Sequence, residues 1–291
     1  MAWNGDLRAT EIGGGRILST SAVALKEIAG RSEAASHRRL DLSMLAGIAI
    51  ALATTIAGVA ATGVRLTYFF QPAGALIVLG GTLGVMFITT PLEALLHSAR
   101  RLAGLAWTRE INRAAVIEEI LICVRTARRV GLLGLEPIIG RVKNAFLKDA
   151  LTLAIDVQKR TDLQSALELK IRLREREGEH DAKTLEVAGG FAPVIGVLGT
   201  VVGLIDILRQ FSNLAAVANG IGIAFLSTIY GLALANLFLL PVAHRIRART
   251  ADEFEANELI LEGVMSVFDG LHPALAQERL NSFLRETQKS A

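Results

Sequence analysis

The chain has 291 residues, of which 52% are hydrophobic and 20% are charged, and its mean hydropathy is +0.44. This composition is too apolar for an ordinary soluble domain and favours a membrane protein. The net charge of +3 gives no case for nucleic-acid binding, and a single cysteine, Cys123, excludes an intrachain disulfide.

An enzyme is the least favoured class. The five histidines are scattered, with no pair at metal-ligand spacing. Neither a nucleophile motif nor a phosphate-binding Gly-Lys loop is present. We therefore expect neither catalysis nor a bound cofactor or metal ion.

Residues 1–41 are predicted to form an N-terminal extension. Charged residues, among them Glu11, Arg16 and Lys26, interrupt each of its apolar stretches, so the segment lacks the basic-then-apolar pattern of a secretory signal. We expect a loose, disordered tail that stays on the protein, and a start codon assigned too far upstream is the open alternative.

Four stretches reach the roughly 20 apolar residues that cross about 30 Å of hydrocarbon as a helix. They are residues 42–64, 72–92, 187–208 and 219–243. None has a charge in its middle, where each charge would cost about 2.5 kcal/mol or more. Basic residues flank the four ends that would then face the cytoplasm: His37, Arg38, Arg39, Arg100, Arg101, Lys183, Arg245, Arg247 and Arg249. Both termini should therefore be cytoplasmic.

The segment between the second and third spans, residues 93–186, has the pattern of soluble helices. Ile117, Ile120, Leu121 and Val124 recur at helical spacing and form one apolar stripe. Similar stripes follow within residues 162–180 and in the tail, residues 244–291. The predicted fold is an all-α membrane protein in which two transmembrane hairpins, residues 42–92 and 187–243, hold a helical cytoplasmic domain made from residues 93–186 and the tail.

The third span contains an unusual number of glycines. Pro193, Gly196, Thr200 and Gly203 fall within an arc of roughly 80° on one helix face. The proline removes a backbone hydrogen bond, frees a carbonyl near Gly189 and tends to kink the helix. A freed carbonyl in hydrocarbon needs a donor, so this face should look toward protein or a hydrated ion path.

The fourth span offers Thr228 and Tyr230, and Pro241 lies at its cytoplasmic end. Two readings stay open for Thr200 and Thr228, because a helical threonine often bonds a carbonyl of its own helix and can instead line an ion site. No aspartate, glutamate or lysine lies deep in any span, although a lone cation carrier would normally contain one. If ions pass, the titrating residue must come from a partner helix.

Five segments carry a resemblance to a known family. “FAPVIGVLGTVVGLI” followed by “STIYGLALAN” resembles the A subunits of bacterial flagellar stators, within the MotA/TolQ/ExbB family. “GALIVLGGTLG”, “ARRVGLLGLEP” and “LEGVMSVFDGLHPALAQERLNSFL” resemble the same subunits in the same order. The resemblance covers nearly everything after residue 40.

The resemblance implies a homo-pentameric ring in the bacterial inner membrane around a dimer of a B-type stator subunit, MotB/PomB-like. That partner would supply the ion-binding aspartate. The ring would couple inward flow of protons or sodium to its own rotation and to torque on a FliG-like rotor switch protein. The ring would bind the transported ion and no cofactor.

The resemblance also assigns roles to single residues. Pro193 and Pro241 match the prolines of the family's last two spans, and Thr200 and Thr228 match positions that face the partner's aspartate. Arg128 and Glu136 match charges that contact the rotor, and their alternative is a solvated helix face.

Other readings of function and ion stay open. A TolQ/ExbB-like energiser would drive a periplasmic partner, and a self-contained transporter would carry ions without one. Two hydroxyls near a carboxylate can complete a sodium shell or hydrogen-bond a protonated acid. Thr200, where an alanine would suffice for a proton, favours sodium.

Overall fold

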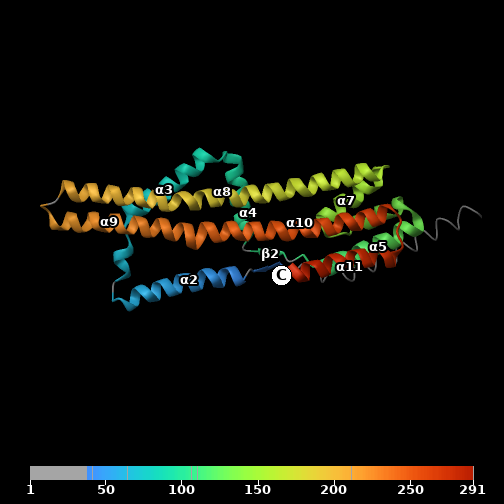
Figure 1. Ribbon diagram of the computed structural model, residues 1–291, viewed down its shortest axis with the longest axis horizontal. Coiled ribbons are helices and arrows are strands. Elements are labelled where there is room, and N and C mark those ends of the chain that lie inside the picture. Colours follow the sequence, from blue (N-terminus) through green and yellow to red (C-terminus); the bar gives the residue numbers. More distant parts are fainter. Residues whose placement is uncertain are drawn as a thin grey trace, which may run out of the picture. The chain divides into compact units, whose positions relative to one another are not determined.

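The structure is a computed structural model that describes residues 38–40, 42–63, 65–105, 107–109, 111–210 and 212–290 (Figure 1). The predicted N-terminal extension lies outside these residues except for 38–40. The described chain is helical apart from two short paired strands, β1 (Arg38–Leu40) and β2 (Trp107–Arg109). The predicted all-α class is confirmed for this part of the chain.

The helices follow one another with short connections. In chain order they are α2 (Leu42–Ala61), η2 (Leu66–Phe69), α3 (Pro72–Thr89), α4 (Leu92–Leu105), α5 (Arg113–Val130), η3 (Leu132–Leu135), α6 (Glu136–Ile139), α7 (Ala145–Asp156), α8 (Arg160–Arg209), α9 (Leu214–Ala233), η4 (Leu234–Leu239), α10 (Leu240–Phe268) and α11 (Pro273–Ser290). The segments η2 and η3 are 3-10 helices, whereas η4 is a π-helix.

Within the described residues, three helical stretches are long and apolar enough to cross a membrane. They are α3, α8 and the continuous run from α9 to α10, Leu214–Phe268, while the apolar stretch Ala46–Ala61 of α2 is shorter. The sequence suggested a soluble helix that ended before the third span, but α8 is one helix of 50 residues. Residues 181–187 contain no glycine or proline, so nothing ends the helix where its surface changes from charged to apolar.

Backbone contacts divide the chain into two compact units. The polar unit comprises residues 109–175 and 251–290, and the apolar unit comprises residues 39–108 and 176–250. Helices α8 and α10 contribute residues to both. The domain boundaries expected from hydropathy mark where the chain would enter and leave the membrane. They stay predictions.

A continuous hydrophobic core holds the polar unit together. The predicted apolar stripe on α5 packs into this core, and Ile117, Ile120, Leu121 and Val124 are all buried. The stripes at the start of α8 and the end of α10 join the same core, together with α7 and α11. Each buried leucine or isoleucine stabilises the fold by roughly 1.5–3 kcal/mol. The three predicted stripes therefore pack together.

Glu119 is a buried acid on α5, and its Oε2 has no hydrogen-bond partner among the described residues. Burial raises the pKa of this carboxyl above its usual value, against the opposing attraction of Lys143. One turn later, burial and the charge of Glu119 raise the pKa of the Cys123 thiol to about 12. Cys123 is therefore a neutral core residue.

Replacing Glu119 by glutamine should stabilise the polar unit at neutral pH. A folded-state pKa above the unfolded value means that stability falls as pH rises from 4.5. The Glu119→Gln gain in melting temperature should therefore be largest at neutral pH and shrink as pH approaches 4.5. Glu278→Gln, at an exposed site on α11, is the control. A gain in melting temperature that grows toward acid pH would contradict the raised pKa of Glu119.

Candidate functional site

Helices α8 and α9 contact each other through glycines, and they lie side by side in Figure 1. A Cβ at Gly196 would lie 2.9 Å from the carbonyl oxygen of Ser227, and one at Gly203 would lie 2.6 Å from that of Gly220. From the opposite side, a Cβ at Gly231 would lie 2.6 Å from a carbonyl oxygen of α8. Poor helix formers are needed here because any side chain would push the two backbones apart.

This contact divides the predicted face of α8. At about 100° per residue, Gly196 and Gly203 form one edge of the arc, while Pro193 and Thr200 form the other. The two glycines are buried against α9 of the same chain, and their expected part in the ion path stays a prediction. Pro193 and Thr200 are half-buried and adjoin exposed apolar side chains such as Val197.

Pro193 does not end the helix, because α8 continues through it. Its missing N–H leaves the carbonyl of Gly189 without the usual donor four residues later. Gly189 is itself buried, and a Cβ there would lie 2.9 Å from the side chain of Leu240. The weakened turn of α8 therefore lies against α10.

The two threonines differ in their hydrogen bonds. The Thr200 hydroxyl donates to the carbonyl oxygen of Val197 at 2.6 Å, so the bond within its own helix is the one observed. Thr228 is half-buried, and its hydroxyl makes no hydrogen bond to any described residue. Its backbone lies beside Gly196, since a Cβ at that glycine would be 3.3 Å from the Thr228 Cα. Of the two hydroxyls, that of Thr228 is available to a ligand.

Tyr230 is engaged elsewhere. Its hydroxyl donates to the carbonyl oxygen of Phe69 and accepts a hydrogen bond of 2.9 Å from the backbone N–H of Gln71. The Gln71 side chain in turn donates to Asn219 Oδ1 at 3.0 Å. Tyr230 therefore fastens the segment before α3 onto α9. The expected part of Tyr230 in the ion path stays a prediction.

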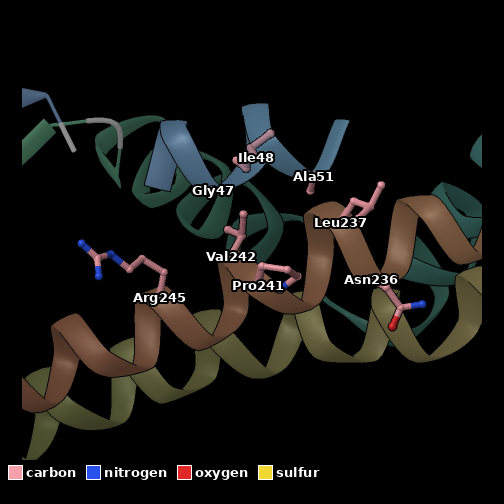
Figure 2. Close-up of a pocket in the computed structure, with 8 residues that line it drawn as sticks. All are labelled: Gly47, Ile48, Ala51, Asn236, Leu237, Pro241, Val242 and Arg245. Carbon is pink, nitrogen blue, oxygen red and sulfur yellow. The ribbon is translucent and has the colours of Figure 1, made fainter. Parts of the chain in front are cut away.

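Pro241 follows the π-helix η4. The backbone N–H of Leu240 bonds the carbonyl oxygen of Ala235, five residues earlier, as a π-helix requires. Because Pro241 has no N–H, it cannot restore the α-helical pattern at its own position. Pro241 also lines a hollow of about 330 Å³ between α2 and the η4–α10 junction (Figure 2).

Arg128 and Glu136 are both exposed, at the end of α5 and the start of α6. Gly131, with a φ of 80°, turns the chain between them. The fully buried Leu135 anchors η3, whereas Leu133 on the same turn is 71% exposed. The polar unit thus presents both charges on a well-anchored turn, and neither forms an ion pair with another described residue.

One buried polar cluster was not predicted from the sequence. The Asp181 carboxylate on α8 is only 2% exposed. It accepts hydrogen bonds from Ser98 Oγ at 2.8 Å and His97 Nδ1 at 3.0 Å, and the Arg101 guanidinium lies 3.5 Å away. Arg101 also donates to Thr250 on α10 at 3.3 Å. The available signal was the spacing of His97, Ser98 and Arg101 on one face of α4.

The acids of the third span lie at its ends. Glu186 precedes Pro193 by seven residues, about 10 Å along the helix, and its carboxylate pairs with Arg247 at 2.6 Å. Asp206, near the other end of α8, accepts a hydrogen bond of 2.8 Å from the Gln210 side chain. No group of three or more His, Cys, Asp or Glu side chains within the described ranges is placed to hold a metal ion.

Adding one methyl group to the α8–α9 contact should destabilise the apolar unit. Gly231→Ala places its Cβ 2.6 Å from a backbone oxygen, an overlap of the kind that costs about 1–3 kcal/mol. Gly222→Ala, on the same helix, meets nothing within 4 Å and should be tolerated. Thermal unfolding in detergent measures both. Equal melting temperatures for the two variants would contradict the packing described above.

Removing the Asp181 carboxylate should also destabilise the apolar unit. Asp181→Ala leaves the Ser98 hydroxyl without its acceptor and removes the carboxylate that pairs with Arg101, and breaking such a buried pair costs about 3 kcal/mol or more. Asp206→Ala removes a carboxylate whose one hydrogen-bond partner among the described residues is Gln210, and it should cost less than about 0.5 kcal/mol. A smaller loss of melting temperature for Asp181→Ala than for Asp206→Ala would count against the cluster.

Known proteins resemble this chain over most of its length. The sequence profile of the MotA/TolQ/ExbB proton channel family matches residues 139–258. Motility protein A of Bacillus subtilis (strain 168) is 29% identical over 249 residues, which cover 84% of this chain and 91% of that protein. The uncharacterized protein YtxD of the same bacterium is 30% identical over 241 residues, 81% of this chain and 86% of that protein.

A solved structure also resembles this chain in three dimensions. The flagellar MotAB stator complex from Bacillus subtilis matches with a TM-score of 0.76 and 28% identity, and the match covers 85% of this chain and 98% of that chain. The resemblance carried by the glycine-rich third span and the ARRVGLLGLEP turn is thus confirmed. The chain belongs to the MotA/TolQ/ExbB proton channel family.

Proposed function

We propose that this chain is an A-type stator subunit of a bacterial flagellar motor, which couples inward flow of protons or sodium to ring rotation and torque. The observation that carries the proposal is the near full-length similarity to motility protein A and to a solved MotAB stator complex. The TolQ/ExbB branch of the family would drive a periplasmic partner instead, and relatives named for motility favour the stator.

In this proposal the chain crosses the inner membrane four times. Helix α2 has 20 residues, so it spans about 30 Å, the thickness of the hydrocarbon core. The apolar parts of α3, α8 and α9–η4 supply the other spans. Basic residues before α2 and after α3 and η4 support cytoplasmic termini and a cytoplasmic polar unit.

A partner must supply the ion-binding carboxylate. The nearest acids on α8, Glu186 and Asp206, lie at the two ends of the third span, and Glu186 is already paired with Arg247. A MotB-like subunit at the centre of a homo-pentamer would place its aspartate against the exposed edge of α8 and the Thr228 hydroxyl. The exposed apolar Val197 and Leu204 continue that edge and fit a neighbouring helix.

Rotation follows from charge in a low-dielectric site. A cation that neutralises the partner's aspartate removes the cost of moving that group past apolar side chains, and release to the cytoplasm restores the charge. The glycine contact makes α8 and α9 move as one body, and the weak turns at Pro193 and Pro241 allow bending. Arg128 and Glu136 would transmit the force to a FliG-like rotor protein, because they are exposed on an anchored turn.

Copurification with a B-type partner tests the proposal. The full chain is co-expressed with the product of the adjacent gene, purified in mild detergent, and its subunits are counted by native mass spectrometry. A pentamer of this chain with a dimer of the partner is expected. A stable monomer, or a ring that never retains the partner, would refute the stator assignment.

Valine at Thr228 should impair ion-driven motility more than valine at Thr200. The Thr228 hydroxyl is unbonded within the described residues, whereas Thr200 already donates its proton to Val197. Swimming speed against external sodium, at fixed pH, measures the effect and identifies the ion. Thr55→Val on α2, whose hydroxyl bonds Ala51, is the control. Greater damage at Thr200 would show that the internal bond does not occupy its hydroxyl.

A further inference from the structure

The hollow beside Pro241 is open to a ligand because two of the three residues in one wall, Gly47 and Ala51, are small. Gly47, Ile48 and Ala51 of α2 line that wall, and at Gly47 an added Cβ would meet nothing within 4 Å. Leu237 and Val242 form the opposite wall (Figure 2). With a volume of about 330 Å³, the hollow is near the lower end of the range for small-ligand sites.

One end of this apolar hollow carries a positive charge. Arg245 and Asn236 lie at opposite ends of the row of lining residues in Figure 2. Arg245 follows Pro241 by one helical turn, about 6 Å, and is exposed. The same end of the span also carries Arg247 and Arg249 in the sequence. An apolar slot that ends at a guanidinium matches a molecule with a hydrocarbon chain and an anionic head.

The surroundings determine which such molecule is present. The membrane placement proposed above, on which this inference rests, puts the first half of α2 and the η4–α10 junction in the cytoplasmic leaflet, where hydrocarbon chains are the solvent. Bacterial inner leaflets contain anionic phospholipids, and a basic residue at this depth attracts their phosphate groups. We infer that the hollow binds one anionic phospholipid, with an acyl chain between α2 and Leu237 and its phosphate at Arg245.

The lipid would have a mechanical consequence. The π-helix and Pro241 weaken the helix at this level, because Pro241 donates no hydrogen bond. A chain seated in the hollow fills the space into which this turn would otherwise bend. Bound lipid would therefore connect α2 to the hinge before α10.

Native mass spectrometry of the purified complex with its B-type partner tests the site. The complex is stripped of lipid and titrated with phosphatidylglycerol or with phosphatidylcholine. The native complex should retain phosphatidylglycerol in preference. Ala51→Phe fills the hollow and should lose both lipids. Arg245→Gln should bind phosphatidylglycerol roughly fivefold more weakly, the loss expected for one basic residue near the surface, and leave phosphatidylcholine unchanged.

Two matched variants serve as controls. Ala57→Phe is on α2 but does not line the hollow, and Arg209→Gln removes a charge at the far end of α8. Both should bind lipid as the native complex does. Native-like retention in Ala51→Phe, or an unchanged lipid preference in Arg245→Gln, would overturn the inference. If Ala51→Phe does not assemble, Arg245→Gln decides alone, and since lipid retention is measured without motility, either result leaves the stator proposal standing.

Discussion

The contact between α8 and α9 is the interaction on which the apolar unit depends. Two helices in hydrocarbon gain nothing from hiding apolar surface, so they stay together only through close packing. Gly196, Gly203 and Gly231 provide it by letting one backbone approach the carbonyl oxygens of the other. The same contact fixes the rotation of α8 about its axis. It therefore determines that Pro193 and Thr200 border the open edge.

Polar contacts are placed where the two long helices carry their charged residues. Asp181 joins α4 to α8, Arg101 reaches α10, and Arg247 bonds Glu179 at 3.0 Å and Glu186 at 2.6 Å. The span between these contacts and Asp206 contains no charge of its own. These contacts stabilise the polar ends of α8 and α10. The middle of the span between them has no charge that would repel or pair with a charged group of another chain.

Sequence periodicity predicted the parts of the fold that depend on neighbours along the chain. The apolar stripes of α5, α8 and α10 were predicted correctly because burial follows helical spacing. The continuity of α8 was missed, since a change in hydropathy was taken for a boundary. The hydrogen bonds of Tyr230 and Asp181 could not be predicted, because their partners lie 161 and 83 residues away in the sequence. The glycine arc was found, but only the structure shows which of its edges packs inside the chain.

In the stator proposal this chain has no ion-binding carboxylate of its own in the membrane, so conduction needs a second chain. Cation flux into proteoliposomes measures this directly, with the purified chain alone, with its B-type partner, and with a partner whose membrane aspartate is changed to asparagine. The account predicts flux only with the unaltered partner. Equal flux from the chain alone would contradict it.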